Sequence, residues 1–274
     1  MEYEKPFLFI DTNFNLDEAL MLKMAFDSFN FEVLGLSTNP GLMSTSKAAE
    51  NIVGLSVAEG LYLSVAKGED ISDSHNDKDI FKTTKDYPEE IPAYENILDK
   101  AEDCGKLDIV TTGPLTNLAK ALREEPEIED FISHIFILGG SLGGEIEENF
   151  KKDPEAIDLI LNTGIDIFII PEEVSKGLSL SDEMIENLSG INQNLDKILD
   201  EYKNVDEDKR ILKAPLLLYL TQAPEAFIFE ESGFKVDTKE EKGALLRVSS
   251  RKKNYMANKV NEDAFYDFVV GSLT

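Results

Sequence analysis

The sequence predicts an α/β protein with a mainly parallel central sheet flanked by helices. Short β-rich runs alternate with stretches of helical period through the first two thirds of the chain, a rhythm typical of parallel sheets. Polar residues or glycines follow directly after four of the predicted strands. The chain contains no Gly/Ser-rich or Pro-rich linker, so we expect residues 1–274 to form a single domain.

The predicted elements of the first part alternate in order. An apolar run at residues 6–10 is the first strand, and a helix-period run begins near Leu16. Residues 68–92 are polar and irregular and predict a long loop, which in a compact domain is often functional. The further strands are predicted at residues 32–38, 62–66, 107–111, 135–138 and 165–170, and the helices at 44–60, 92–102, 115–123 and 153–162.

The last third changes character. Residues 234–236 and 245–248 predict a small antiparallel excursion, and residues 206–210 form a charged break. Helices are predicted at residues 181–188, 192–203, 214–221 and 261–271.

Composition excludes several classes of function. Acidic residues outnumber basic ones 54 to 27, and such a surface repels nucleic-acid backbones and anionic membranes. Cys104 is the single cysteine, so no intrachain disulfide can form, and its acidic neighbours disfavour a reactive thiolate. The first ten residues do not resemble a signal peptide and no apolar run reaches membrane-spanning length, so we expect a cytoplasmic protein.

The most informative stretch is residues 11–18, DTNFNLDE, directly after the first strand. Three acids, Asp11, Asp17 and Glu18, crowd this turn together with two asparagines. Ligands bind at the carboxyl ends of strands in open α/β sheets, and clustered carboxylates need a cation, a polyol or solvent. Alternatively, Asp11 and Asp17 simply cap the following helix.

Four positions are expected to converge at one edge of the sheet. Asp11, Thr38, Thr112 and Gly139 each come just after a predicted strand. The paired glycines at 139–140 and 143–144 allow the backbone to approach a ligand closely, although they could equally be ordinary turns.

The histidines do not form a catalytic or zinc constellation. His134 precedes a strand and is expected to be structural, whereas His75 lies in the long loop and is a candidate ligand contact. Two histidines and one cysteine are too few for a typical zinc site.

Several motifs together resemble the inosine-uridine-preferring nucleoside hydrolases. The octet is similar to the family's calcium-binding signature, D-x-D-P-G-x-D-D, and the further matches come in family order. They are STNPG at 37–41, VAKG at 65–68, TGPLTN at 112–117, GGSLGG at 139–144, EEN at 147–149 and DPEA at 153–156. The resemblance implies the family's fold, with the C-terminal half contributing to the pocket, and hydrolysis of the N-glycosidic bond of ribonucleosides.

The resemblance also assigns roles to four residues of the octet, and two of these four depart from the pattern. Asp11 matches a supporting acid, and Asp17 matches the acid that binds a ribose hydroxyl. Asn13 replaces the aspartate that ligates calcium and serves as general base, and an amide cannot accept the proton of water. Glu18 replaces a bidentate calcium ligand and is one methylene longer.

The remaining family roles fall on five positions. Thr112 matches the residue whose backbone carbonyl coordinates calcium, and Glu147 and Asn149 match residues that bind ribose. Near the C-terminus the family has His-Asp, in which the histidine protonates the leaving base and the aspartate ligates calcium. This chain has Lys213 and Ala214 there instead. The asparagine that usually closes the family's second-strand motif is Leu42.

These replacements predict that calcium, the cofactor of intact relatives, is not bound. Of three expected carboxylate ligands only Glu18 remains, while calcium takes about six to eight oxygens and its affinity follows ligand charge. We hypothesise that Lys213 supplies the missing positive charge and pairs with Asp11, Asp17 or Glu18. Alternatively, its side chain points to solvent.

We therefore expect a nucleoside hydrolase-like protein of weak or absent activity that binds a nucleoside or ribose. A non-catalytic binding protein and a structural homologue with a vestigial pocket are the alternatives. The sequence is compatible with a homo-oligomer but does not determine the oligomeric state.

Overall fold

The computed structural model describes residues 5–70, 75–82 and 87–274. Within these ranges ten strands form one sheet, in the order β4-β3-β2-β1-β5-β6-β7-β10-β8-β9. The pairs from β4 to β10 are parallel, and β8 pairs antiparallel with both β10 and β9. The predicted α/β class, the mainly parallel sheet and the antiparallel C-terminal part are confirmed.

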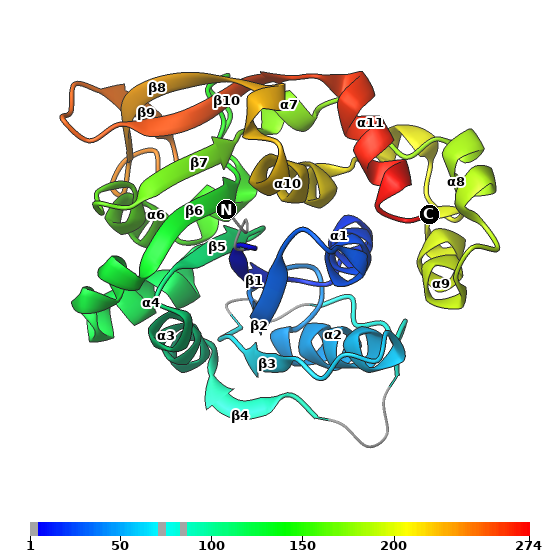
Figure 1. The fold of residues 1–274 in the computed structure, drawn as a ribbon. Coiled ribbons are helices and arrows are strands. Elements are labelled where there is room, and N and C mark those ends of the chain that lie inside the picture. Colours follow the sequence, from blue (N-terminus) through cyan, green and yellow to red (C-terminus); the bar gives the residue numbers. More distant parts are fainter. Residues whose placement is uncertain (1–4, 71–74, 83–86) are drawn as a thin grey trace.

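Strands and helices lie close to their predicted positions through most of the chain (Figure 1). The strands are β1 Phe7–Thr12, β2 Glu32–Thr38, β3 Ser64–Lys67, β4 Glu89–Pro92, β5 Leu107–Thr111, β6 Ile132–Leu138, β7 Asp166–Ile170, β8 Phe227–Val236, β9 Leu245–Val248 and β10 Asn254–Val260. The α-helices are α1 Leu16–Asp27, α2 Thr45–Ala58, α3 Ala93–Cys104, α4 Thr116–Glu124, α5 Glu148–Lys152, α6 Pro154–Leu161, α7 Glu172–Ser175, α8 Asp182–Leu188, α9 Gln193–Tyr202, α10 Lys213–Gln222 and α11 Glu262–Gly271.

Three predicted segments need correction. The long loop predicted at 68–92 contains β4, which pairs with β3; part of this loop, residues 71–74 and 83–86, lies outside the described residues. The antiparallel part is larger than expected, because β8 has ten residues and β10 was not predicted. Strand β10 was missed because Asn254 and Lys259 interrupt its apolar pattern, yet it joins the parallel and antiparallel parts through β7 and β8.

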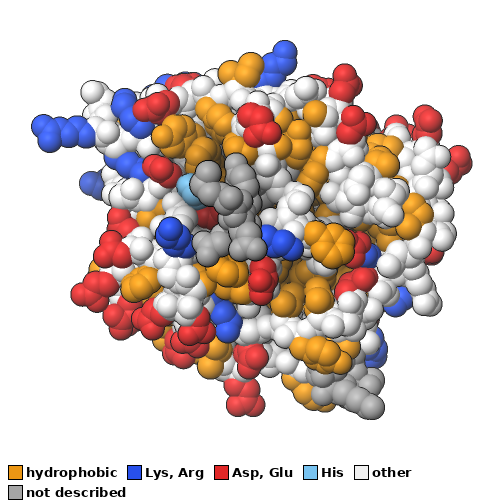
Figure 2. Space-filling view, in the orientation of Figure 1, with side chains coloured by type: hydrophobic (Ala, Val, Ile, Leu, Met, Phe, Trp, Pro, Cys, Tyr) orange, Lys and Arg blue, Asp and Glu red, His pale blue; other side chains and the backbone are white. Residues whose placement is uncertain are grey.

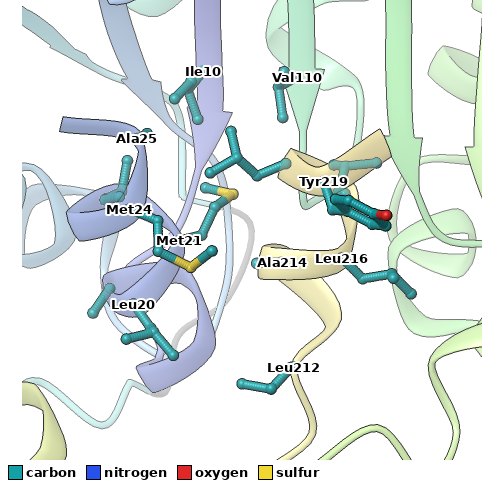
Figure 3. Close-up of a cluster of buried hydrophobic side chains, with 14 of the residues drawn as sticks. Ile10, Leu20, Met21, Met24, Ala25, Val110, Leu212, Ala214, Leu216 and Tyr219 are labelled. Atoms are coloured by element: carbon teal, nitrogen blue, oxygen red, sulfur yellow. The ribbon is translucent and has the colours of Figure 1, made fainter. Parts of the chain in front are cut away.

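The two faces of the sheet carry separate cores. Phe9 and Ile10 are consecutive and therefore point to opposite faces: Phe9 packs with residues of α3, α4 and α6, and Ile10 with residues of α1, α2 and α10. Figure 3 shows the second core where α1 meets α10, with Met21 and Met24 opposite Ala214 and Leu216. This packing fixes the N-terminal end of α10 against the start of α1, beside the carboxyl edge of the sheet.

Charge is spread over the surface. Acidic side chains are scattered across the face drawn in Figure 2, many of them toward its outline. No helix in the described ranges has both the length and the apolar character that crossing a membrane requires.

Candidate active site

A cleft of about 1010 Å³ lies at the carboxyl edge of the sheet. The turns after β1, β2, β5 and β6 line it, together with α5, α7 and the start of α10. Thr112 and Gly139 line the cleft as predicted, whereas Asp11 and Thr38 lie at the same edge and are completely buried. The expected convergence of the four strand ends is therefore observed.

Asp11 is held beneath the floor of the cleft by the strands beside it. Its Oδ1 accepts hydrogen bonds from Ser37 Oγ at 2.6 Å and from Asn117 Nδ2 at 2.9 Å, while its Oδ2 is buried without a partner. Burial raises the pKa of Asp11 to about 6 although Ser37 and Asn117 oppose the shift. Asp11 thus supports the floor and is not among the residues that line the cleft.

Asn13 has a fixed orientation in the wall of the cleft. Its Nδ2 donates to the backbone carbonyls of Asn39 at 2.9 Å and Met43 at 3.3 Å, so the oxygen must point the other way. A Cβ at Gly41 would lie only 2.2 Å from Asn13 Cγ, so the absent side chain at Gly41 gives this amide its space. The side chain at the expected base position is therefore a neutral amide used as a hydrogen-bond donor.

Both oxygens of Glu18 have protein partners. Oε2 accepts from the backbone N–H of Asn15 at 2.8 Å, which completes a capping box at the start of α1, and Oε1 accepts from Thr112 Oγ1 at 2.7 Å. Thr112 Oγ1 also lies 2.7 Å from Thr12 Oγ1. Burial, and then the nearby charge of Asp17, raise the pKa of Glu18 to about 7.

The start of α10 brings Ala214 and Lys213 to the cleft. The backbone N–H of Ala214 donates to Asp17 Oδ2 at 3.2 Å, and its methyl group is buried in the core between α1 and α10 (Figure 3). Burial raises the pKa of Asp17, while this N–H and the charge of Lys213 oppose the shift.

Lys213 does not form the ion pair that the sequence suggested. Its Nζ lies 3.7 Å from Glu172 Oε1, and among the described residues it makes no ion pair with Asp11, Asp17 or Glu18. Each of these acids instead accepts hydrogen bonds from nearby donors of other residues. The side chain nevertheless lines the cleft, so it does not simply point into bulk solvent.

The donor atoms present here do not fit a calcium site. Asn13 contributes at most one amide oxygen, Ala214 contributes none, and Glu18 is committed to Asn15 and Thr112. The backbone oxygen of Thr112 accepts from Asn149 Nδ2 at 2.9 Å. In the part of the chain that the structure describes, no cluster of three or more His, Cys, Asp or Glu residues is arranged to hold a metal ion. The absence of bound calcium in solution remains a prediction.

Glu147 and Asn149 lie on the opposite wall, at the start of α5. Glu147 Oε2 caps this helix by accepting from the backbone N–H groups of Asn149 and Phe150. Asn149 Nδ2 donates to the carbonyl oxygens of Thr112 and Leu138. In the described part of the chain, no side chain donates a hydrogen bond to Oε1 of Glu147, Oδ1 of Asn149 or Oδ1 of Asp17. All three residues line the cleft, so these oxygens are candidate acceptors for a ligand.

The segment carrying His75 is tied to the loop after β2. His75 lines the cleft as predicted, its Nδ1 is buried without a partner, and its Nε2 lies 4.0 Å from Asp70 Oδ1. The backbone N–H of Asn76 donates to the carbonyl oxygen of Leu42 at 2.7 Å. His134 is remote from the cleft lining and pairs with Asp108, which raises its pKa.

Two asparagines of the floor had no role assigned from sequence. Asn117 Nδ2 bridges Asp11 Oδ1 and the carbonyl oxygen of Thr38, and Asn39 lines the cleft with both polar side-chain atoms buried and unpartnered. A Cβ at Gly113 would lie 2.2 Å from Asn39 Oδ1. Asn117 lies in the motif at 112–117 and Asn39 in the motif at 37–41. The spacing of these motifs does not show which strand ends the amide of Asn117 connects.

Comparison with known proteins decides the family. The sequence model of the inosine-uridine preferring nucleoside hydrolases matches residues 8–267. The chain belongs to this family.

Relatives named as nucleosidases or nucleoside hydrolases cover most of the chain. It is 29% identical over 263 residues to a probable uridine nucleosidase 2 of Arabidopsis thaliana, which covers 84% of this chain and 82% of that protein. It is 24% identical over 319 residues to a probable ribonucleoside hydrolase of Dictyostelium discoideum, covering 97% and 94% of the two chains.

Solved structures share the fold. A purine-preferring ribonucleoside hydrolase from Gardnerella vaginalis has a TM-score of 0.87 at 22% identity and covers 97% of this chain and 98% of its own. A plant nucleoside hydrolase has a TM-score of 0.84 at 21% identity, with 99% of both chains covered. At these identities the structures establish the fold, and the family is established by the sequence.

Proposed function

We propose that the cleft binds a ribonucleoside through its sugar hydroxyls and hydrolyses the N-glycosidic bond slowly and without calcium. The observation that carries this proposal is that Asp17, Glu147 and Asn149 line one cleft from two walls, and each has a side-chain oxygen to which no side chain of the described residues donates. Hydroxyl groups are the natural donors to such oxygens, and a ribose presents several at fixed spacing. The family assignment supplies the reaction, and the chain's own residues limit its rate.

The limit arises because the position of the family's general base is occupied by Asn13, which cannot accept a proton from water. Asn13 is a neutral amide whose nitrogen is committed to two carbonyls, and Asp11 lies beneath the floor with its Oδ1 already hydrogen bonded. General-base catalysis contributes typically ~10²–10⁴-fold to a rate. We assign to Lys213 the contact with the leaving base, since it stands at the family's histidine position and lines the cleft.

Nucleoside binding and ribose release test the proposal together. Isothermal titration with inosine and uridine is expected to show binding that EDTA does not change, and metal analysis of the purified protein is expected to show no stoichiometric calcium. Ribose release should be far below that of relatives with the intact signature, assayed side by side. Calcium-dependent turnover at ordinary enzyme rates would refute the proposed mechanism, and failure of any nucleoside or ribose to bind would refute the proposed function itself.

A further inference from the structure

The motif at residues 153–156 directly follows α5, which forms one wall of the cleft. Asp153 ends α5 and caps the start of α6, since its Oδ1 accepts from the backbone N–H of Ala156 at 3.0 Å. Its second oxygen, Oδ2, accepts from Thr116 Oγ1 at 2.7 Å, and Thr116 is the first residue of α4. Neither Asp153 nor Thr116 is among the residues that line the cleft. One carboxylate therefore joins the end of α5 to the starts of α4 and α6.

Helix α5 is too short to hold its own position. It has five residues, and a helix of this length is not stable by itself in water. Its first end is fixed by the carboxylate of Glu147, which accepts from the backbone N–H groups of Asn149 and Phe150. Its last end is fixed by Asp153 through the hydrogen bond to Thr116. The candidate acceptor oxygens of this wall therefore lie on a segment that is held at its two ends.

The hydrogen bond between Thr116 and Asp153 connects α5 to the floor of the cleft. Asn117 follows Thr116 in the chain, and its Nδ2 donates to Asp11 Oδ1 at 2.9 Å and to the carbonyl oxygen of Thr38 at 3.0 Å. Asp11 and Thr38 lie in the last turns of β1 and β2, so the start of α4 is fixed to the carboxyl edge of the sheet. Because Thr116 is the next residue, its bond to Asp153 holds the end of α5 at a set place relative to that edge.

Apolar packing complements this bond but does not replace it. Phe150 is completely buried and anchors α5 in the core, beside the backbone of Gly139 and Gly140. Burial of apolar surface is non-directional, so it fixes the depth of α5 better than its orientation. The orientation decides where Asn149 points, whose Nδ2 donates to the carbonyl oxygens of Thr112 and Leu138. The directional hydrogen bonds at the two ends of α5 therefore set the direction of this side chain.

We propose that Asp153 is a positioning residue for the sugar-binding wall and acts through its hydrogen bond to Thr116. This inference rests on the proposed function. It assigns to the motif at 153–156 the task of holding Glu147 and Asn149 in the orientation in which their oxygens accept from sugar hydroxyls. Because the effect passes through the sugar alone, loss of the bond weakens the binding of ribose, inosine and uridine by the same factor. The preference among nucleobases stays unchanged.

Three substitutions separate this bond from the capping of α6. Thr116→Val removes the hydroxyl group and leaves Asp153 to cap α6. Asp153→Ser keeps a good capping residue, but its single oxygen is occupied by the cap. Thr116→Ser keeps the hydroxyl group and is the rescue variant. Thr221→Val is the matched control, because Thr221 is also half-buried, donates to the carbonyl oxygen of Leu218 within α10 and does not line the cleft.

Titration of the folded variants with ribose, inosine and uridine gives the first outcome. Thr116→Val and Asp153→Ser are each expected to weaken the binding of all three ligands about three- to tenfold. The variant with both changes should lose less than the product of the two single losses, because both remove the same bond. Thr116→Ser and Thr221→Val should bind as the wild type does. Wild-type affinity in Thr116→Val, an equal loss in Thr221→Val, or single losses that multiply in the double variant would overturn the positioning role.

Hydrogen exchange of the ligand-free protein gives the second outcome and does not depend on the proposed function. Peptides that cover residues 147–153 are expected to exchange faster in Thr116→Val than in the wild type, and at the wild-type rate in Thr116→Ser and Thr221→Val. Unchanged exchange of this segment in Thr116→Val would overturn the positioning role. A wild-type protein that binds none of the three ligands would overturn the proposed function, and the exchange rates would then still decide whether the bond holds α5.

Discussion

The two walls of the cleft differ in what their polar atoms are bound to. On the wall formed by α1 and α10, Glu18 has both oxygens occupied and Ala214 offers only its N–H to Asp17. On the wall formed by α5, Glu147 and Asn149 each use one polar atom to hold the backbone and keep one oxygen for the cleft. On the first wall only Asp17 keeps an oxygen to which no side chain of the described residues donates, whereas the second wall keeps two such oxygens.

The difference teaches that residues other than the family's expected ligands can be accommodated without a change of fold. A cluster of carboxylates without a cation repels itself, and each buried acceptor without a donor costs about 1–3 kcal/mol. Here Asn15, Thr112 and Ala214 supply donors to Glu18 and Asp17. The residues that depart from the family pattern therefore coincide with local contacts that stabilise Asp17 and Glu18.

The largest effect is expected from rebuilding the first wall. The triple variant Asn13→Asp, Lys213→His, Ala214→Asp restores the base and two carboxylate ligands of the family pattern. We expect calcium binding measurable by isothermal titration and an increase in ribose release of about 10²–10⁴-fold in calcium.

The double variant Lys213→His, Ala214→Asp, which keeps Asn13, is the control. It should gain some calcium affinity with little activity, because the amide still cannot take the proton of water. If the triple variant folds and binds calcium but releases ribose no faster than the wild type, the contrast between the two walls does not explain the rate.

The second prediction concerns the pH dependence of stability. The pKa of Glu18 is raised from its ordinary value to about 7, so folding favours the protonated form. The stabilising contribution of this group is present below about pH 4 and is lost as the pH rises toward 7. Over this interval the free energy of unfolding falls by up to about 1.4 kcal/mol for each increase of one in pH.

Glu18→Gln removes this contribution. Urea unfolding between pH 4 and 8 should show a smaller decline in the free energy of unfolding for Glu18→Gln than for the wild type. Glu148→Gln, an exposed residue of the opposite wall, controls for the loss of one negative charge. Equal declines for Glu18→Gln and the wild type would contradict the burial of a carboxyl group with a raised pKa in the first wall.

The position of the cleft at the edge of the sheet could be predicted from sequence, whereas the partner of Lys213 and strand β10 could not. Strand runs followed by Asp11, Thr112 and Gly139 predicted the edge of the sheet because parallel strands end together. The location of Lys213 was harder, because its partner Glu172 lies in the four-residue helix α7, which has no sequence signal of its own. Likewise β10 was missed because its burial comes from neighbouring strands rather than from an alternating pattern.

The third prediction concerns the space that the absent side chain of Gly41 leaves for the amide group of Asn13. Gly41→Ala would place a methyl group 2.2 Å from Asn13 Cγ, so the amide must leave the carbonyls of Asn39 and Met43. We expect a loss of about 1–3 kcal/mol in the free energy of unfolding, measured with urea. Gly271→Ala is the control, since nothing lies within 4 Å of the added Cβ, and it should be close to neutral.

The smallest effect distinguishes the two uses of Asp17, which lies on the first wall. Its Oδ2 accepts from Ala214 at the start of α10, and we propose that its other oxygen binds a sugar hydroxyl. Asp17→Ala loses both contacts, so it should lower the free energy of unfolding by about 1 kcal/mol and weaken nucleoside binding. Asp17→Asn keeps one oxygen, which can still accept from Ala214, but places an amide nitrogen where the sugar needs an acceptor. Its stability should therefore stay near that of the wild type while inosine binding weakens about tenfold. Should Asp17→Asn bind inosine normally, Asp17 serves only to cap α10, and the sugar is held by the α5 wall alone.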